Sequence, residues 1–161
     1  MRDLRGILAR LAKADFPFVL VGGYAAFAHG ATLVTQDVDV CCDFTESSLR
    51  QLNQAVRDLH PVHRMRPDRP PLAITPEYHK GLRNLYLDTD LGPLDLLGEV
   101  KGIGEYQAVK EQSIEVSIDD TKVRVLSLNG LIAAKSAMDR DRDKEAVRQL
   151  TAIRDLRKKN R

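Results

Sequence analysis

The chain has 161 residues and a mass of 18.0 kDa, with 43% hydrophobic and 30% charged residues, which is the size and composition of one globular domain and excludes wholesale disorder. Its formal net charge of +2 argues against a surface that is basic all over, as expected for a general nucleic-acid binder. With four Tyr, four Phe and no Trp, a platform that stacks several bases is not expected either.

The first half of the chain predicts helices and strands in alternation. Leu4, Ile7, Leu8 and Leu11 recur at the spacing of one helix face, which predicts an amphipathic helix over residues 3–14. The elements expected next are a buried strand at 18–21, a short helix at 25–29, a strand at 37–43 and a helix at 45–59. Thr45 is the expected N-cap of the last helix, with Ser48 at the capping-box position where Glu is preferred, so the box is expected to be imperfect.

Residues 60–81 differ from the rest of the chain, because they hold five of its seven prolines together with several Arg and His residues. We interpret them as a basic, Pro-rich insertion, solvated or forming a rim for an anionic acceptor, with one short strand at 72–75. The elements expected afterwards are strands at 82–88 and 94–97, a hairpin over 113–126, helices at 128–138 and 144–156, and a frayed basic tail at 157–161.

This order predicts an α+β fold in which helices pack mainly on one face of a mixed sheet, with residues 1–161 forming a single domain. Cys41 and Cys42 are adjacent, so they are expected to be small buried hydrophobes in a reducing cytoplasm. Residues 16–36 carry no charged side chain, but Pro17 and the glycine pair favour a strand, a turn and a helix over a membrane span. With no secretion signal at its start, the protein is expected to be cytoplasmic.

Two carboxylates form the most informative pattern. Asp37 and Asp39 alternate with valines in a predicted strand, so both side chains point to one face, about 7 Å apart at Cα. Two unpaired carboxylates at that distance repel each other, and a divalent cation relieves the repulsion. Oxygen-only ligation suits Mg²⁺. The alternative is a strand whose acidic face is simply solvated.

Two further features favour a functional site. Gly22 and Gly23 lie between a strand and a helix, where backbone N–H groups can bind an anion. Asp95 lies between leucines in a predicted strand, where a buried carboxylate needs a partner. If that strand neighbours the strand of Asp37 and Asp39, the three acids converge, which points to metal-assisted phosphoryl or nucleotidyl transfer.

Residues 21–30 (VGGYAAFAHG) and 35–40 (TQDVDV) together resemble the signature of the nucleotidyltransferase superfamily, a Gly-Gly or Gly-Ser turn, a helix and Asp-x-Asp on the next strand. The chain is most similar to minimal bacterial nucleotidyltransferases related to the AbiE-type abortive-infection toxins. Asp95 matches the third acid of the superfamily, and residues 131–135 (LIAAK) with 140–143 (RDRD) resemble the C-terminal helical motif of those proteins. The resemblance covers roughly residues 4–150.

The resemblance implies a polymerase-β-like fold and Mg²⁺-dependent or Mn²⁺-dependent transfer of a nucleoside monophosphate from a triphosphate such as ATP to a hydroxyl of a tRNA-like RNA or a protein. Asp37, Asp39 and Asp95 would hold two metal ions, or Asp95 would act as the base near the acceptor hydroxyl. Gly22 and Gly23 would bind the β- and γ-phosphates, and Lys135 would neutralise phosphate charge.

The sequence departs from this pattern at two positions. Gly23 stands where many members of the superfamily have Ser, and Leu33 stands where relatives with a His-Gly element often have Arg. The second departure leaves an alternative open, in which the chain is a weak or inactive partner protein of a toxin–antitoxin system and binds a cognate toxin or antitoxin. A nucleic-acid-binding module that uses residues 60–81 and the tail is a third hypothesis.

Overall fold

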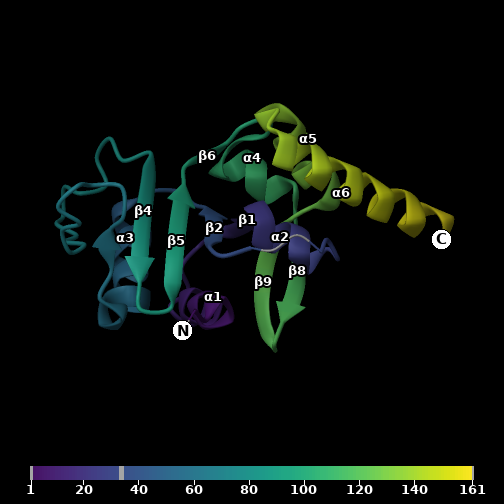
Figure 1. The fold of residues 1–161 in the computed structure, drawn as a ribbon. Helices are drawn as coiled ribbons and strands as arrows, with labels where there is room; N and C mark the ends of the chain where they lie inside the picture. Colours follow the sequence, from purple (N-terminus) through teal and green to yellow (C-terminus); the bar gives the residue numbers. More distant parts are fainter. Residues whose placement is uncertain (1, 33–34, 161) are drawn as a thin grey trace.

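A seven-stranded mixed sheet forms the centre of the protein (Figure 1), in a computed structural model that describes residues 2–32 and 35–160. Its strands, in spatial order, are β3 (Val62–His63), β4 (Asn84–Thr89), β5 (Gly92–Leu97), β2 (Val38–Cys41), β1 (Val19–Val21), β9 (Thr121–Leu126) and β8 (Ser113–Ile118). The β2–β5 and β1–β9 pairs are parallel, and the other four pairs are antiparallel. A separate two-stranded sheet consists of β6 (Glu99–Val100) and β7 (Gly104–Glu105).

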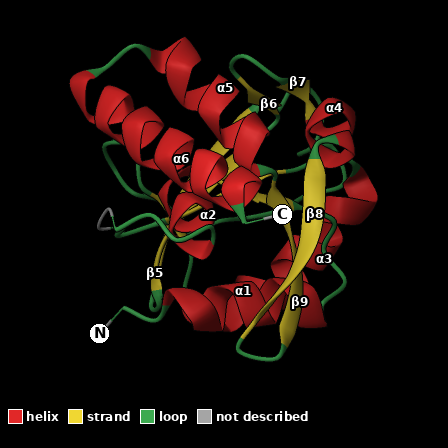
Figure 2. Ribbon diagram, turned by 90° about the vertical axis from the view of Figure 1, so that its right-hand side faces the viewer, coloured by secondary structure: helices red, strands yellow, loops and turns green. Residues whose placement is uncertain are grey.

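The helices pack around this sheet. They are α1 (Leu4–Lys13), α2 (Gly22–Ala28), α3 (Glu46–Val56), α4 (Tyr106–Glu111), α5 (Leu128–Met138) and α6 (Asp141–Lys159), with a 3₁₀ turn η1 (Arg57–Leu59) after α3. Helix α1 packs against α3 and against strands β2, β5 and β9, while α5 and α6 lie side by side (Figure 2). The predicted α+β class, a mixed sheet with helices packed on it, is confirmed.

Alternation along β2 separates the core from the candidate site. Val38 and Val40 are fully buried, and Leu20 of β1 is paired with Val40. Because successive side chains of a strand point to opposite faces, Asp39 turns away from these apolar side chains. The central strand therefore contributes to the core with one face and presents a carboxylate on the other.

The sequence predicted most boundaries, but four details differ. The strand expected at 72–75 is absent among the described residues, and the insertion instead pairs with the sheet through β3 and a single bridge at Pro71. Helix α2 begins at Gly22 and so includes both glycines. Elements β6, β7 and α4 were not predicted, since each is too short to show a periodic pattern. The capping box of α3 is complete, because Ser48 Oγ accepts from the Thr45 N–H.

The basic tail is also more ordered than expected. Helix α6 continues to Lys159, so Arg157 and its neighbours are helical rather than frayed. The Arg157 guanidinium donates a hydrogen bond of 3.0 Å to the carbonyl of His29, which ties α6 to the end of α2. Within residues 2–32 and 35–160, no helix is both long enough and apolar enough to span a membrane.

The capping box of α3 predicts the effect of a substitution. Thr45 Oγ1 accepts a 3.0 Å hydrogen bond from the Ser48 N–H, so Thr45→Ala should lower the free energy of unfolding by about 1 kcal/mol in urea titrations. Ser47→Ala, at an exposed position of the same first helical turn, is the matched control and should change it by less than about 0.5 kcal/mol. Equal losses in the two variants would contradict the role of the cap.

Candidate active site

Three carboxylates from two neighbouring strands converge on one point of the sheet. Asp39 of β2 and Asp95 of β5 are paired in the register of the parallel strands, and Asp37 precedes β2 on the same side. One carboxylate oxygen from each of the three residues lies within 4.8 Å of the other two. The convergence that the sequence made conditional on adjacent strands is therefore present in the fold.

The electrostatics of this cluster are unfavourable without a cation. Burial, followed by the charges of Asp37 and Asp95, raises the pKa of Asp39 to about 7, while the charge of Lys135 opposes the shift. Burial also raises the pKa of Asp95, although its hydrogen bond to Arg64 acts in the opposite direction. The cluster thus favours either a shared proton or a bound positive charge.

Gly22 lets the backbone pass next to the acids. Its φ of +71° lies in the left-handed region, and a Cβ placed there would lie 2.2 Å from Asp39 Oδ2. Gly23 is less constrained, since its Cβ would lie 3.2 Å from Thr35 Oγ1. The first turn of α2 therefore lies directly beside the carboxylates, and only glycine fits at its first position.

Lys135 is held in place by a buried carboxylate rather than freely solvated. Its Nζ lies 3.6 Å from Asp143 Oδ1, and the exposed fraction of the Asp143 side chain is only 1%. Burial alone would raise the pKa of Asp143, but a hydrogen bond from Arg140 and the charge of Lys135 outweigh it, so the pKa is lowered. Asp143 lies in the first turn of α6 and pairs with both Lys135 and Arg140.

Arg64 is the site residue that sequence reasoning did not identify. The sequence placed it in the basic insertion, but its guanidinium forms an ion pair with Asp95. Strand β3 pairs with β4, which brings Arg64 alongside Tyr86, the residue opposite Asp95 on β4. A two-residue strand has no periodic signal, so nothing in the sequence indicated this pairing.

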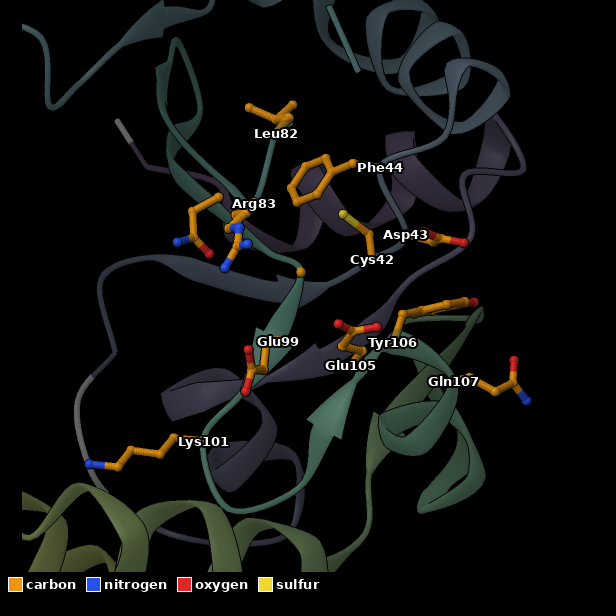
Figure 3. Close-up of a pocket in the computed structure, with 12 residues that line it drawn as sticks. Cys42, Asp43, Phe44, Leu82, Arg83, Glu99, Lys101, Glu105, Tyr106 and Gln107 are labelled. Carbon is orange, nitrogen blue, oxygen red and sulfur yellow. The ribbon is translucent and has the colours of Figure 1, made fainter. Parts of the chain in front are cut away.

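A cavity of about 710 Å³ opens at the carboxyl ends of β2 and β5 (Figure 3). Its lining residues are Cys42, Asp43, Phe44, Leu82, Arg83, Asn84, Gly98, Glu99, Lys101, Glu105, Tyr106 and Gln107. Asn84 is two residues from Tyr86, which pairs with Asp95, so Asn84 shares the face of the acids. None of the three acids lines this cavity, and Glu99 follows Asp95 by four residues, about 13 Å along an extended chain, so the cavity and the acidic cluster are separate features of the same sheet.

Three other titratable side chains have structural roles. His29 is buried, its Nε2 donates a hydrogen bond of 2.9 Å to the Leu126 carbonyl, and Nδ1 faces the Arg157 guanidinium at 3.3 Å. Burial lowers the pKa of His29, so it packs neutral. Burial raises the pKa of the Cys41 thiol to about 12 and that of Cys42 as well, so both are unreactive hydrophobes.

Leu33, on which the inactive alternative rested, lies outside the described residues.

The comparisons with known proteins agree with this geometry at the level of the fold. No family model matches the sequence, and no curated protein matches it significantly. The structure is similar to the crystal structure of the lincosamide antibiotic adenylyltransferase LnuA with lincomycin bound, with a TM-score of 0.54 and 18% identity, over 85% of this chain and 87% of that chain. The chain has a nucleotidyltransferase fold. The relation to AbiE-type toxins stays a prediction.

The pKa of Asp39 predicts how stability depends on pH. The folded carboxyl keeps its proton to about pH 7, whereas an unfolded Asp releases it near pH 4, so in metal-free buffer stability should fall as the pH rises between these values. Asp39→Asn should remove most of this dependence and be about 2 kcal/mol more stable than the wild type at pH 8. Urea titrations at pH 5 and pH 8 in a chelator measure both. Asp43→Asn, an exposed acid just beyond β2, should keep the wild-type dependence.

The close approach of Gly22 predicts a second stability effect. Gly22→Ala should destabilise the protein by about 2–4 kcal/mol, since it combines left-handed backbone strain with a clash against Asp39. Gly81→Ala isolates the strain, because Gly81 has a φ of +73° and nothing within 4 Å of the added Cβ, and it should cost only about 1–2 kcal/mol. Denaturant titrations of both variants compare them, and equal losses would rule out the contact with Asp39.

Proposed function

We propose that this protein is a divalent-metal-dependent nucleotidyltransferase, which transfers a nucleoside monophosphate from a nucleoside triphosphate to a hydroxyl group and releases diphosphate. The observation that carries the proposal is the meeting of Asp37, Asp39 and Asp95 beside Gly22, in a fold shared with an adenylyltransferase. The acids supply oxygen ligands for the divalent metal ion that accompanies a triphosphate.

The donor set fits Mg²⁺ or Mn²⁺. All three candidate ligands are carboxylates, which these hard cations prefer, and burial together with their mutual repulsion raises the pKa of Asp39. When bound, such a cation neutralises phosphate charge and acts as a Lewis acid. We assign Asp37, Asp39 and Asp95 as its candidate ligands.

The chain's own residues divide the remaining tasks. Gly22 and Gly23 would bind the β- and γ-phosphates, since the first N–H groups of a helix have no intrahelical partner. Lys135, oriented by Asp143, would offset the negative charge of the phosphates. Asp95 would accept the proton of the acceptor hydroxyl, whose oxygen forms a bond to the α-phosphorus while the bond to the leaving diphosphate breaks.

Since the reacting hydroxyl of the acceptor must itself reach Asp95, we assign the part of the acceptor that lies away from this hydroxyl to the cavity at the ends of β2 and β5. Its volume of about 710 Å³ lies within the range of small-molecule sites, so it would hold one compact group. The lincosamide adenylyltransferase was solved with a small molecule bound, which supports a free small molecule as a possible acceptor. The other possible acceptors are the terminal nucleotide of a tRNA-like RNA and a side chain of a protein. Acidic residues outnumber basic ones in the lining (Asp43, Glu99 and Glu105 against Arg83 and Lys101), which favours a neutral or cationic acceptor group over an anionic one.

Transfer of label from each of the four α-labelled nucleoside triphosphates, in the presence of Mg²⁺ and a cell extract, tests the proposal. RNA, protein and small-molecule fractions are counted separately, so the experiment also identifies the acceptor class. Asp37→Asn and Asp39→Asn should each lower the transfer rate at least about a hundredfold, because each removes a metal ligand.

The matched control is Asp90→Asn, which removes an exposed acid of the turn between β4 and β5, outside the cluster, and it should retain transfer within about threefold. Equal transfer by wild type and Asp37→Asn would contradict the proposal. If the wild type neither transfers label nor binds triphosphate in calorimetry, the alternative of an inactive partner protein in a toxin–antitoxin system is favoured instead.

A further inference from the structure

The Arg64 guanidinium is held at the acidic cluster by several independent contacts. It pairs with Asp95 Oδ1, donates a 3.1 Å hydrogen bond to the Leu87 carbonyl, and lies 3.9 Å from Asp88 Oδ1. It also stands over the Tyr86 ring, with Cζ 5.8 Å from the ring centroid. These partners all belong to β4 and β5, so the guanidinium is fixed against the sheet.

The backbone contributes to the same placement. The Arg64 N–H donates a 3.0 Å hydrogen bond to the Tyr86 carbonyl, directly after the two residues of β3 that pair with β4. The exposed fractions of the Arg64 and Asp95 side chains are 24% and 15%. Displacing Arg64 would therefore leave a partly buried carboxylate without its partner, which is costly.

The charges of the cluster leave room for one divalent cation. The three carboxylates carry three negative charges when ionised, and Arg64 offsets one of them. The charge of Lys135 lowers the pKa of Asp39, but Lys135 is itself paired with Asp143, so we count its charge with that pair and not against the three acids. The two remaining negative charges are what a single divalent cation balances, whereas a second cation would compete with the guanidinium for Asp95.

We propose that Arg64 is the resident cation on the Asp95 side of the site, so that the protein binds one divalent metal ion at Asp37 and Asp39 where the resemblance implied two. This inference rests on the proposed function and deepens it. In the reaction, Arg64 acts as a positioning residue that orients Asp95 and supplies fixed positive charge beside the acceptor hydroxyl.

The number of Mn²⁺ ions bound per chain, measured by electron paramagnetic resonance without nucleotide, tests this inference. The wild type should bind one ion. Arg64→Met should bind two, the first about tenfold more tightly, because a like charge has been removed. Arg64→Lys keeps the charge and should bind one ion. Arg66→Met, which removes an exposed arginine of the same insertion, is the matched control and should match the wild type.

The outcomes separate this inference from the proposed function. Two ions on the wild type, or identical binding by wild type and Arg64→Met, would overturn the inference and leave the proposed function standing. No bound Mn²⁺ on the wild type in the absence of nucleotide would also overturn the inference, whereas the proposed function stands or falls with the transfer of label. Circular dichroism melting checks that Arg64→Met is folded, and Arg64→Gln, which keeps a donor for the Leu87 carbonyl, replaces it if it is not.

Discussion

The arrangement of the site follows from three carboxylates that the sheet forces into one place. Asp39 and Asp95 are paired across parallel strands whose alternate residues fill the core, so neither can turn away without moving Val38, Val40 or Leu96 out of it. The repulsion between the acids is therefore a consequence of the fold, and it adds to burial in raising the pKa of Asp39. The residues next to the cluster either bring positive charge to it or leave space for its carboxylates.

Three of these residues come from distant parts of the chain. Gly22 brings the first turn of α2 next to Asp39, Arg64 comes from the insertion, and Lys135 comes from α5. Arg64 and Lys135 are each held by a further acid, Asp88 and Asp143 respectively. Fixed charges of this kind need no reorganisation when a reacting group arrives, which is the usual way in which an active site stabilises developing charge.

The sequence predicted the parts of the site that lie on regular elements. Alternation with valines was enough to place Asp37 and Asp39 on one face, and the leucines around Asp95 were enough to predict a buried strand. What it could not predict was the partner of Asp95, because Arg64 reaches the site through the two-residue strand β3. The cavity was missed for the same reason, since part of its lining comes from β6, β7 and α4, which are too short to give a pattern. Ser48 completed a capping box for which the sequence rule prefers Glu, because its hydroxyl is close enough to bond the Thr45 N–H.

The near-neutral net charge of +2 conceals this internal separation of charge. The three acids of the cluster lie on or next to the central strands β2 and β5, while the basic residues that face them come from the insertion and from α5. Because the ligand-free cluster is destabilising, any cation that binds the folded state and not the unfolded one stabilises the fold as it completes the site. Stability and ligand binding are thus coupled through the same three side chains, and a substitution that relieves the repulsion stabilises the protein at the expense of the site.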